Sequence, residues 1–161
     1  MGLEADAVSV AAGTLDVIRT PDVLGIAEAN AGKPIPVAAH HAGDYDVVLF
    51  LTKETDVDWR DDVVRVRDGQ FLGSGGGFGG GIIRREEVEA GKPFVEGEGR
   101  LGLDDGNELV SVDGVSADHA VQMLFDQQVV ATADVAPHGY FVLAAVLPPD
   151  SVVTVGLPDP R

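Results

Sequence analysis

The apolar residues of this chain are gathered in short β-branched and aromatic runs, most clearly in its last third. Four such runs lie at 120–125, 129–135, 139–146 and 152–155, separated by segments rich in Asp, Gln, Pro, Gly and Ser. Runs of this length, with turn-forming residues between them, predict a meander of antiparallel strands.

Two further runs occupy the first half of the chain. A strand is expected at 46–52, and its continuous apolar run at 47–51 is typical of a strand buried on both faces or central in its sheet. A shorter run at 35–37 precedes it. The segment 63–72 contains the dipeptide Asp68-Gly69 between two strand-like halves. Because Asp-Gly supplies the positive φ values of a tight two-residue turn, we expect a hairpin here.

The N-terminal part predicts two short strands, at 7–10 and 15–18, followed by a helix. Thr20 suits the N-cap of that helix, Pro21 its first turn and Gly32 its C-terminal cap. An irregular loop is the alternative to this helix. Its expected buried face comprises Val23, Ile26 and Ala27.

The middle of the chain has the weakest pattern. Its glycine tract at 73–81 predicts a mobile, solvent-exposed loop, because glycines lose much conformational entropy on ordering and bring few side chains to pack. The charged stretch 84–89 is either a helical turn or a solvated edge. Turns are expected at 104–107 and at Asp113-Gly114, on either side of a strand at 108–112.

Length and composition favour an all-β protein. The 161 residues fit one domain, and 21 glycines and nine prolines suit many turns better than a helical bundle. We predict a single antiparallel β-sandwich domain over 1–161, with at most one or two short helices. A subdivision into 1–72 and 108–161, around the glycine-rich middle, is the alternative organisation.

The apolar runs also bear on location. None approaches the roughly 20 residues that a membrane helix needs, so we expect a soluble protein with no membrane partner. Acidic Glu4 and Asp6 stand where a signal peptide would carry positive charge, which favours the cytoplasm. Without cysteine there is no disulfide and no thiolate metal ligand.

The charge balance is strongly acidic. There are 27 Asp and Glu against 11 Lys and Arg, a formal net charge of −16, and such a surface repels nucleic acid. Lysine occurs only at Lys33, Lys53 and Lys92. An acid-rich, lysine-poor composition resembles that of proteins from salt-accumulating archaea, whose salty cytoplasm screens self-repulsion; acidic proteins of high-GC bacteria are the alternative.

The segment 112–155 resembles a known class of domain. It comprises a strand, a hairpin, a Pro-His-Gly-Tyr-Phe entry into an apolar strand and a closing Val-Val-Thr-Val strand. This order is similar to the small immunoglobulin-like or prealbumin-like sandwiches of uncharacterised prokaryotic proteins. The resemblance implies a β-sandwich but no activity. The chain departs from it in having no cysteine pair, and its one tryptophan, Trp59, lies between Asp58 and Arg60.

The glycine tract satisfies a nucleotide-binding pattern in its letters. Gly75, Gly77 and Gly80 have the spacing of the dinucleotide fingerprint, which works between a strand and a helix in a βαβ unit. The segment before the tract is predicted as a hairpin, and no P-loop lysine follows. A surface loop or a close backbone crossing is therefore the favoured interpretation, and a phosphate-cradling loop is the alternative.

A second group of candidate residues surrounds a histidine pair. Imidazoles and carboxylates are ordinary metal ligands, but adjacent strand residues point to opposite faces, so His40 and His41 cannot share a partner easily. We therefore predict no tightly bound transition metal and no cofactor. The candidate ligand-binding residues are His40, His41, Asp44, Asp46 and His138.

Acidic clusters at 56–62 and 104–108 have oxygen ligands suited to calcium, but neither follows the EF-hand pattern. A solvated acidic face is the favoured interpretation of both. Paired carboxylates for glycoside hydrolysis stay open, because their spacing is set in space and not in sequence. No serine lies in a Gly-x-Ser-x-Gly elbow.

The favoured function is a non-enzymatic binding or protein-interaction module, acting with a protein partner or as a homo-oligomer. The alternative is a small metal-dependent or carboxylate/histidine enzyme that uses residues 40–46 with His119 or His138. The two functions predict different arrangements of these side chains. An enzyme needs several such groups in one pocket with shifted pKa values, whereas groups scattered over the surface favour the binding module.

The net charge of −16 generates a prediction about salt. Screening should stabilise the fold, since the Debye length falls from about 10 Å at 0.1 M to about 3 Å at 1 M salt. We expect the unfolding temperature to rise between about 0.1 and 1 M KCl, and a further steep rise to about 3 M would support the halophilic interpretation. A matched osmolyte series at low salt is the control. A midpoint indifferent to KCl would show that the acidic surface does not determine stability.

Overall fold

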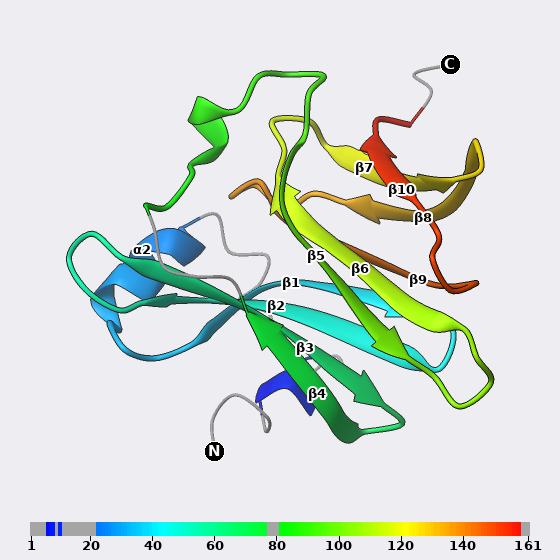
Figure 1. Cartoon of the computed structure of the whole chain (residues 1–161). Helices are drawn as coiled ribbons and strands as arrows, with labels where there is room; N and C mark the ends of the chain where they lie inside the picture. Colours follow the sequence, from blue (N-terminus) through cyan, green and yellow to red (C-terminus); the bar gives the residue numbers. More distant parts are fainter. Residues whose placement is uncertain (1–5, 9, 11–21, 77–80, 159–161) are drawn as a thin grey trace.

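The computed structural model describes residues 6–8, 10, 22–76 and 81–158. The predicted all-β class is confirmed, with 54% strand and 10% helix. The described strands form three antiparallel sheets (Figure 1), and the immunoglobulin-like character of the C-terminal half stays a prediction.

Sheet A has the order β1 (Ile35–Ala42), β2 (Tyr45–Lys53), β3 (Trp59–Arg67) and β4 (Gln70–Gly76). Sheet B has the order β5 (Phe94–Gly102), β6 (Glu108–Val115) and β9 (Tyr140–Leu147). Sheet C has the order β10 (Val153–Gly156), β7 (Ala120–Phe125) and β8 (Gln128–Asp134).

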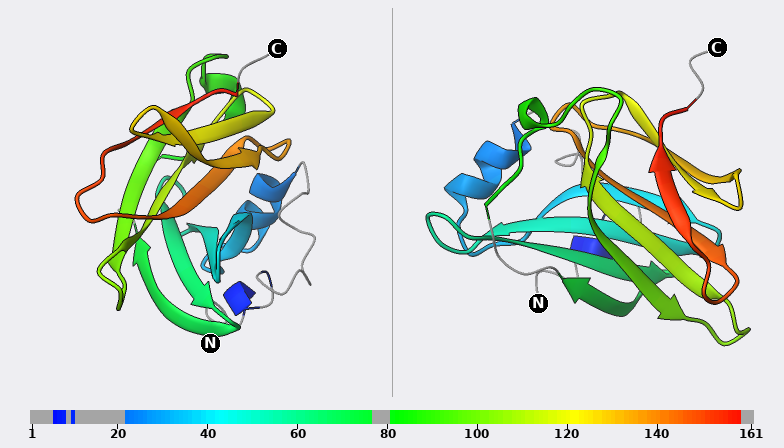
Figure 2. Two further views of the ribbon diagram at one scale, coloured as in Figure 1. Left: turned by 90° about the vertical axis from the view of Figure 1, so that its right-hand side faces the viewer. Right: turned by 45° about the horizontal axis from the view of Figure 1, so that its top comes forward.

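Hydrophobic clusters hold the sheets together in layers. The first lies between sheets A and B and includes Leu49 of β2 with Leu109 of β6 and Val142 of β9. The second joins the other face of sheet B to sheet C and includes Met123 and Leu143. Figure 2 shows the same order, with sheet B between sheets A and C. Strands β6 and β9 of sheet B are therefore buried on both faces, whereas the edge strand β5 is largely exposed.

Strand β2 fulfils the prediction of a central, doubly buried strand. It pairs with β1 on one side and β3 on the other. Because side chains alternate along a strand, Val47 and Leu49 enter the cluster beneath sheet B. Val48 and Phe50 point to the opposite face, where a third cluster forms. The continuous apolar run at 47–51 thus supplies side chains to two hydrophobic clusters.

The N-terminal part differs from its prediction in one element. Residues 6–8 and 10 are helical, so the strand expected at 7–10 is wrong. Ala7 and Val10 are three residues apart, which places both on one helix face, and both are buried in the cluster of Phe50 and Val64. The strand expected at 15–18 lies outside the described residues.

The predicted helix is present as α2 (Val23–Ala29). Val23 and Ala27 are buried as expected, and Ile26 packs partly buried against the same cluster. Asp22 is at the N-cap position without a side-chain hydrogen bond, whereas the expected cap Thr20 lies outside the described residues. Among the described helices none is long and apolar enough to cross a membrane.

The predicted hairpin joins β3 to β4. Asp68 and Gly69 have φ values of 49° and 78°, the positive values that the turn requires. Strand β4 continues to Gly76 in register with β3, so the loop expected at 73–81 is wrong for 73–76. Pairing uses backbone groups alone, which glycine supplies as well as any residue. Residues 77–80 lie outside the described part of the chain.

The connection between β4 and β5 is fastened to sheet B. The charged stretch forms the short 3-10 helix η2 (Arg85–Glu87), as one of its two interpretations predicted. Arg85 Nη2 donates a hydrogen bond to the carbonyl oxygen of Ala117 at 2.8 Å. Tyr140 Oη donates to the carbonyl oxygen of Ile83 at 2.6 Å. This segment is therefore attached to β9 and to the loop that follows β6.

The turn expected at Asp113-Gly114 is wrong, because both residues continue β6 and pair with β9. Strand β5, which the sequence did not reveal, carries a bulge between Val95 and Gly97 on the other side of β6. A Cβ built on Gly114 would overlap the carbonyl oxygen of Phe94. Gly114 therefore marks a close approach of two backbones, not a turn.

This close approach generates a prediction. We expect Gly114→Ala to lower the free energy of unfolding by about 1–3 kcal/mol, since the bulged strand has to shift to admit the methyl group. The measurement is urea unfolding followed by circular dichroism. Gly102→Ala is the matched control, because a Cβ at this other strand glycine meets open space. Equal stability of the two variants would contradict the proposed role of Gly114.

Candidate functional site

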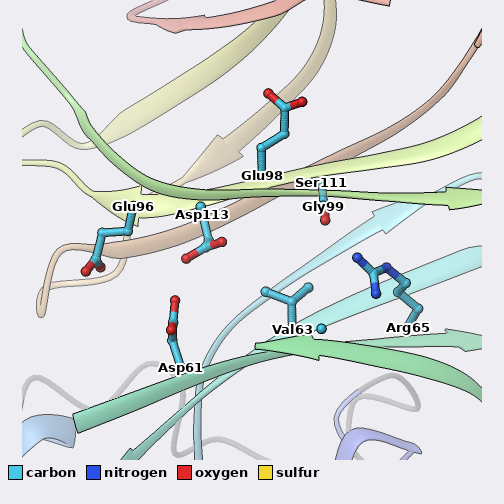
Figure 3. A pocket seen from close by; sticks show the side chains of 10 residues that line it. Asp61, Val63, Arg65, Glu96, Glu98, Gly99, Ser111 and Asp113 are labelled. Atoms are coloured by element: carbon cyan, nitrogen blue, oxygen red, sulfur yellow. The ribbon is translucent and has the colours of Figure 1, made fainter. Parts of the chain in front are cut away.

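A cleft opens where the edge strands of sheets A and B face each other. Its volume is about 320 Å³, within the range of small-molecule sites. Figure 3 shows it with Arg65 at one end and the carboxyl groups of Asp61 and Asp113 at the other. The lining residues come from β3, β4, β5 and β6 and are Asp61, Val63, Arg65, Gly75, Glu96, Gly97, Glu98, Gly99, Ser111 and Asp113.

Strand alternation positions the polar side chains. On β3, Asp61 and Arg65 share a face with the buried Val63. On β6, Ser111 and Asp113 share the face turned toward them, and they pair with Gly99 and Gly97 of β5. The missing side chains of these two glycines leave the space that the polar groups occupy.

Arg65 is a buried cation. Only 7% of its surface is exposed, and its Nε has no hydrogen-bond partner within the described part of the chain. Among the described residues it makes no ion pair, and burial lowers its pKa. The guanidinium lies against Gly99, where a Cβ would overlap Nη2. The chain therefore holds a desolvated positive charge at this end of the cleft.

Asp113 is the most buried carboxyl group of the cleft, with 4% of its surface exposed. Its Oδ2 has no hydrogen-bond partner among the residues that the structure describes. Burial raises its pKa to about 8, and the charges of Asp61 and Glu96 and a hydrogen bond with Asp61 act in the same direction. Figure 3 shows the Asp61 and Asp113 carboxyls pointing toward each other across the gap between the sheets.

Glu96 stands at the rim of the cleft. It is the extra residue of the β5 bulge, next to Gly97, which pairs with Asp113. Its side chain is exposed overall, but partial desolvation of its carboxyl beside the surrounding strands and then the charge of Asp61 raise its pKa to about 7. Glu96 and Asp61 also line a neighbouring hollow of about 130 Å³. That hollow is bounded further by Leu51, Trp59, Arg60, Gly81, Ile82 and Tyr140.

The residues predicted from sequence lie elsewhere. His41 Nδ1 is 3.0 Å from Asp46 Oδ1 on the exposed face of the β1–β2 hairpin, and Asp44 is exposed in its turn. His40 is half-buried, and burial and the charge of His41 lower its pKa. His138 is buried before β9, its Nδ1 accepting a hydrogen bond from the Tyr140 amide at 3.1 Å. The cleft lining, as described, includes none of the five predicted residues.

The acidic cluster at 56–62 is divided by the strand. Asp61 faces the cleft, whereas Asp62 points to the other side of sheet A, where its Oδ1 lies 3.2 Å from Arg60 Nη2. Across the described part of the chain, no group of three or more His, Asp or Glu side chains is arranged to hold a metal ion.

Sequence reasoning missed Arg65, Glu96 and Asp113. The available signals were Arg65 between the apolar Val64 and Val66 and the glycines that alternate with charged residues at 97–99. Comparison of the chain with protein-family models, curated proteins and solved structures finds no match. The interpretation of the cleft therefore depends on its geometry and chemistry.

The raised carboxyl pKa values predict how stability varies with pH. A carboxyl whose pKa is higher in the folded state binds its proton more tightly there, so its contribution is complete below the unfolded pKa and is lost as pH rises through the folded value. The pKa of Glu96 rises from 4.5 to about 7 on folding, and that of Asp113 from 3.8 to about 8. We therefore expect the free energy of unfolding to fall as pH rises from about 4 to about 8, and this decline to level off above the folded values.

Asp113→Asn removes the largest of these proton linkages and should flatten the decline, which urea unfolding at several pH values measures. Each unit of raised pKa corresponds to about 1.4 kcal/mol. Asp134→Asn, at an exposed position on β8, is the control and should keep the wild-type slope. An unchanged slope in Asp113→Asn would contradict the burial of an ionisable group at this position.

Proposed function

We propose that this chain is a non-enzymatic module that binds a small molecule in the cleft, with an anionic group of the ligand on Arg65. The carrying observation is the buried guanidinium, 7% exposed and without an ion pair among the described residues. Burying a charge without a partner costs several kcal/mol, and a ligand anion offsets that cost.

The chemistry of Arg65 supports a carboxylate or phosphate as its partner. A guanidinium presents a planar set of donors that matches these anions in a bidentate manner. Ser111 Oγ belongs to the same end of the cleft, opposite Gly99, and adds a neutral hydrogen-bonding group. Glu98 lines the cleft as well, but its Oε2 is engaged by Arg100 Nη2 at 2.9 Å. An anion therefore meets its counter-charge at Arg65.

A second candidate function is a small acid–base enzyme. The observation that favours it is the facing pair Asp61 and Asp113, since carboxyl groups that keep a proton at neutral pH are typical of general acids. It differs from the enzyme expected from sequence, which used residues 40–46. Asp113→Asn separates the two functions, because it leaves anion binding at Arg65 intact but abolishes turnover if Asp113 is catalytic.

The test of anion binding replaces Arg65. We expect acetate, butyrate and inorganic phosphate to shift the amide resonances of Gly97 and Gly99 in the wild type, and Arg65→Met to weaken this binding by at least about tenfold, as loss of a charged hydrogen bond implies. Without ligand, Arg65→Met should also unfold at higher temperature, because an unpaired buried donor is removed at a gain of about 1–3 kcal/mol.

Arg67→Met is the matched control. Arg67 lies on the same strand but is exposed, 5.3 Å over the ring of Tyr45 and beside Asp68. This variant should bind the anions as the wild type does. Equal binding by Arg65→Met and wild type would refute the proposal, whatever the stability of the variant.

A further inference from the structure

The two ends of the cleft carry groups of opposite charge, a guanidinium at one end and carboxyl groups at the other, and the strands hold them a fixed distance apart. We propose that its ligand is a small zwitterion, with an ammonium group held among Asp61, Glu96 and Asp113 and an anionic group on Arg65. This inference rests on the proposed function and adds the class of ligand to it.

The ammonium end is formed by three carboxyl side chains from three strands. Asp61 comes from β3, Glu96 from the bulge of β5 and Asp113 from β6. Only 4% of the surface of Asp113 is exposed, and its Oδ2 has no hydrogen-bond partner among the described residues. An ammonium group has three donors and no acceptor, so it can donate one hydrogen bond to each carboxylate.

A polyatomic cation suits this end better than a metal ion. The described His, Asp and Glu side chains are not arranged as a metal-ligand set. Three like charges close together raise one another's cost of ionisation, and a bound cation removes that cost. A ligand that carries both charges would supply a cation to the carboxyl groups and an anion to Arg65, which has no ion pair among the described residues.

The register of β5 sets the distance between the two charges. The guanidinium of Arg65 lies against Gly99, and Asp113 pairs with Gly97 two residues away. Two residues along an antiparallel strand span roughly 7 Å. A ligand whose ammonium and carboxylate are adjacent, as in glycine, is too short to reach both ends. Each bond of an extended saturated chain advances it by roughly 1.25 Å. An ω-amino acid with four or five carbons therefore places its nitrogen and a carboxylate oxygen roughly 6–7.5 Å apart.

The test is a chain-length series bound to the full chain and measured by calorimetry. The probes are glycine, 3-aminopropanoate, 4-aminobutyrate, 5-aminopentanoate and 6-aminohexanoate, each paired with the alkanoate of equal length. We expect the affinity to peak at 4-aminobutyrate or 5-aminopentanoate, at least about tenfold above butyrate or pentanoate. Asp113→Asn should reduce that preference while alkanoate binding stays unchanged.

The outcomes distinguish this inference from the function on which it rests. If pentanoate binds the wild type as tightly as 5-aminopentanoate, or if no member of the series exceeds its alkanoate, the zwitterion is refuted while the anion site stands. If neither series binds, both proposals fail. Glu96→Gln, at the rim of the cleft, is a second variant should Asp113→Asn not fold, and it should lower the preference for the amine in the same way.

Discussion

The absence of side chains at two positions of β5 is the constraint on which the cleft depends. Gly97 and Gly99 leave room for Asp113 and for the guanidinium of Arg65, and a Cβ at Gly99 would overlap that guanidinium. Strand β6 is in turn able to approach the bulge because residue 114 is glycine. The polar groups of the cleft are thus accommodated by small residues on neighbouring strands, while the hydrophobic clusters on either side of sheet B hold those strands in place.

The sequence pattern predicts the elements that depend on local chemistry. The Asp68-Gly69 hairpin follows from backbone dihedral preferences, and the central place of β2 follows from its continuous apolar run. Strand β5 was not predictable in this way, because its alternating glycines and charged residues resemble a loop in composition. What makes it a strand is pairing with β6, which is a tertiary interaction.

The candidate site was hidden for a related reason. Asp113-Gly114 has the composition of a turn, yet the glycine serves a close backbone approach and the aspartate is buried beside it. The histidines and aspartates of 40–46 were predicted as ligand-binding residues because they are close together in sequence. Asp61, Glu96 and Asp113, in contrast, come together only through the packing of sheets A and B. The charged Arg65 between Val64 and Val66 was the local signal in the sequence that pointed most directly to the cleft.

The attachment of the segment 81–92 has a mechanical consequence. Arg85 and Tyr140 bind it to the sheet B side of the molecule. Arg84 Nη2 donates to Glu28 Oε1 of α2 at 2.8 Å, and α2 packs on sheet A, so the segment ties the two sheets together beside the cleft. One wall of the cleft, β5 and β6, belongs to sheet B, and the other wall, β3 and β4, belongs to sheet A. Any widening of the cleft therefore requires one sheet to slide or tilt against the other over their shared apolar cluster. A close-packed interface resists such shear. The distance between Arg65 and the carboxyl groups is therefore fixed by the packing of the two sheets, and ligands of a different length fit the cleft less well.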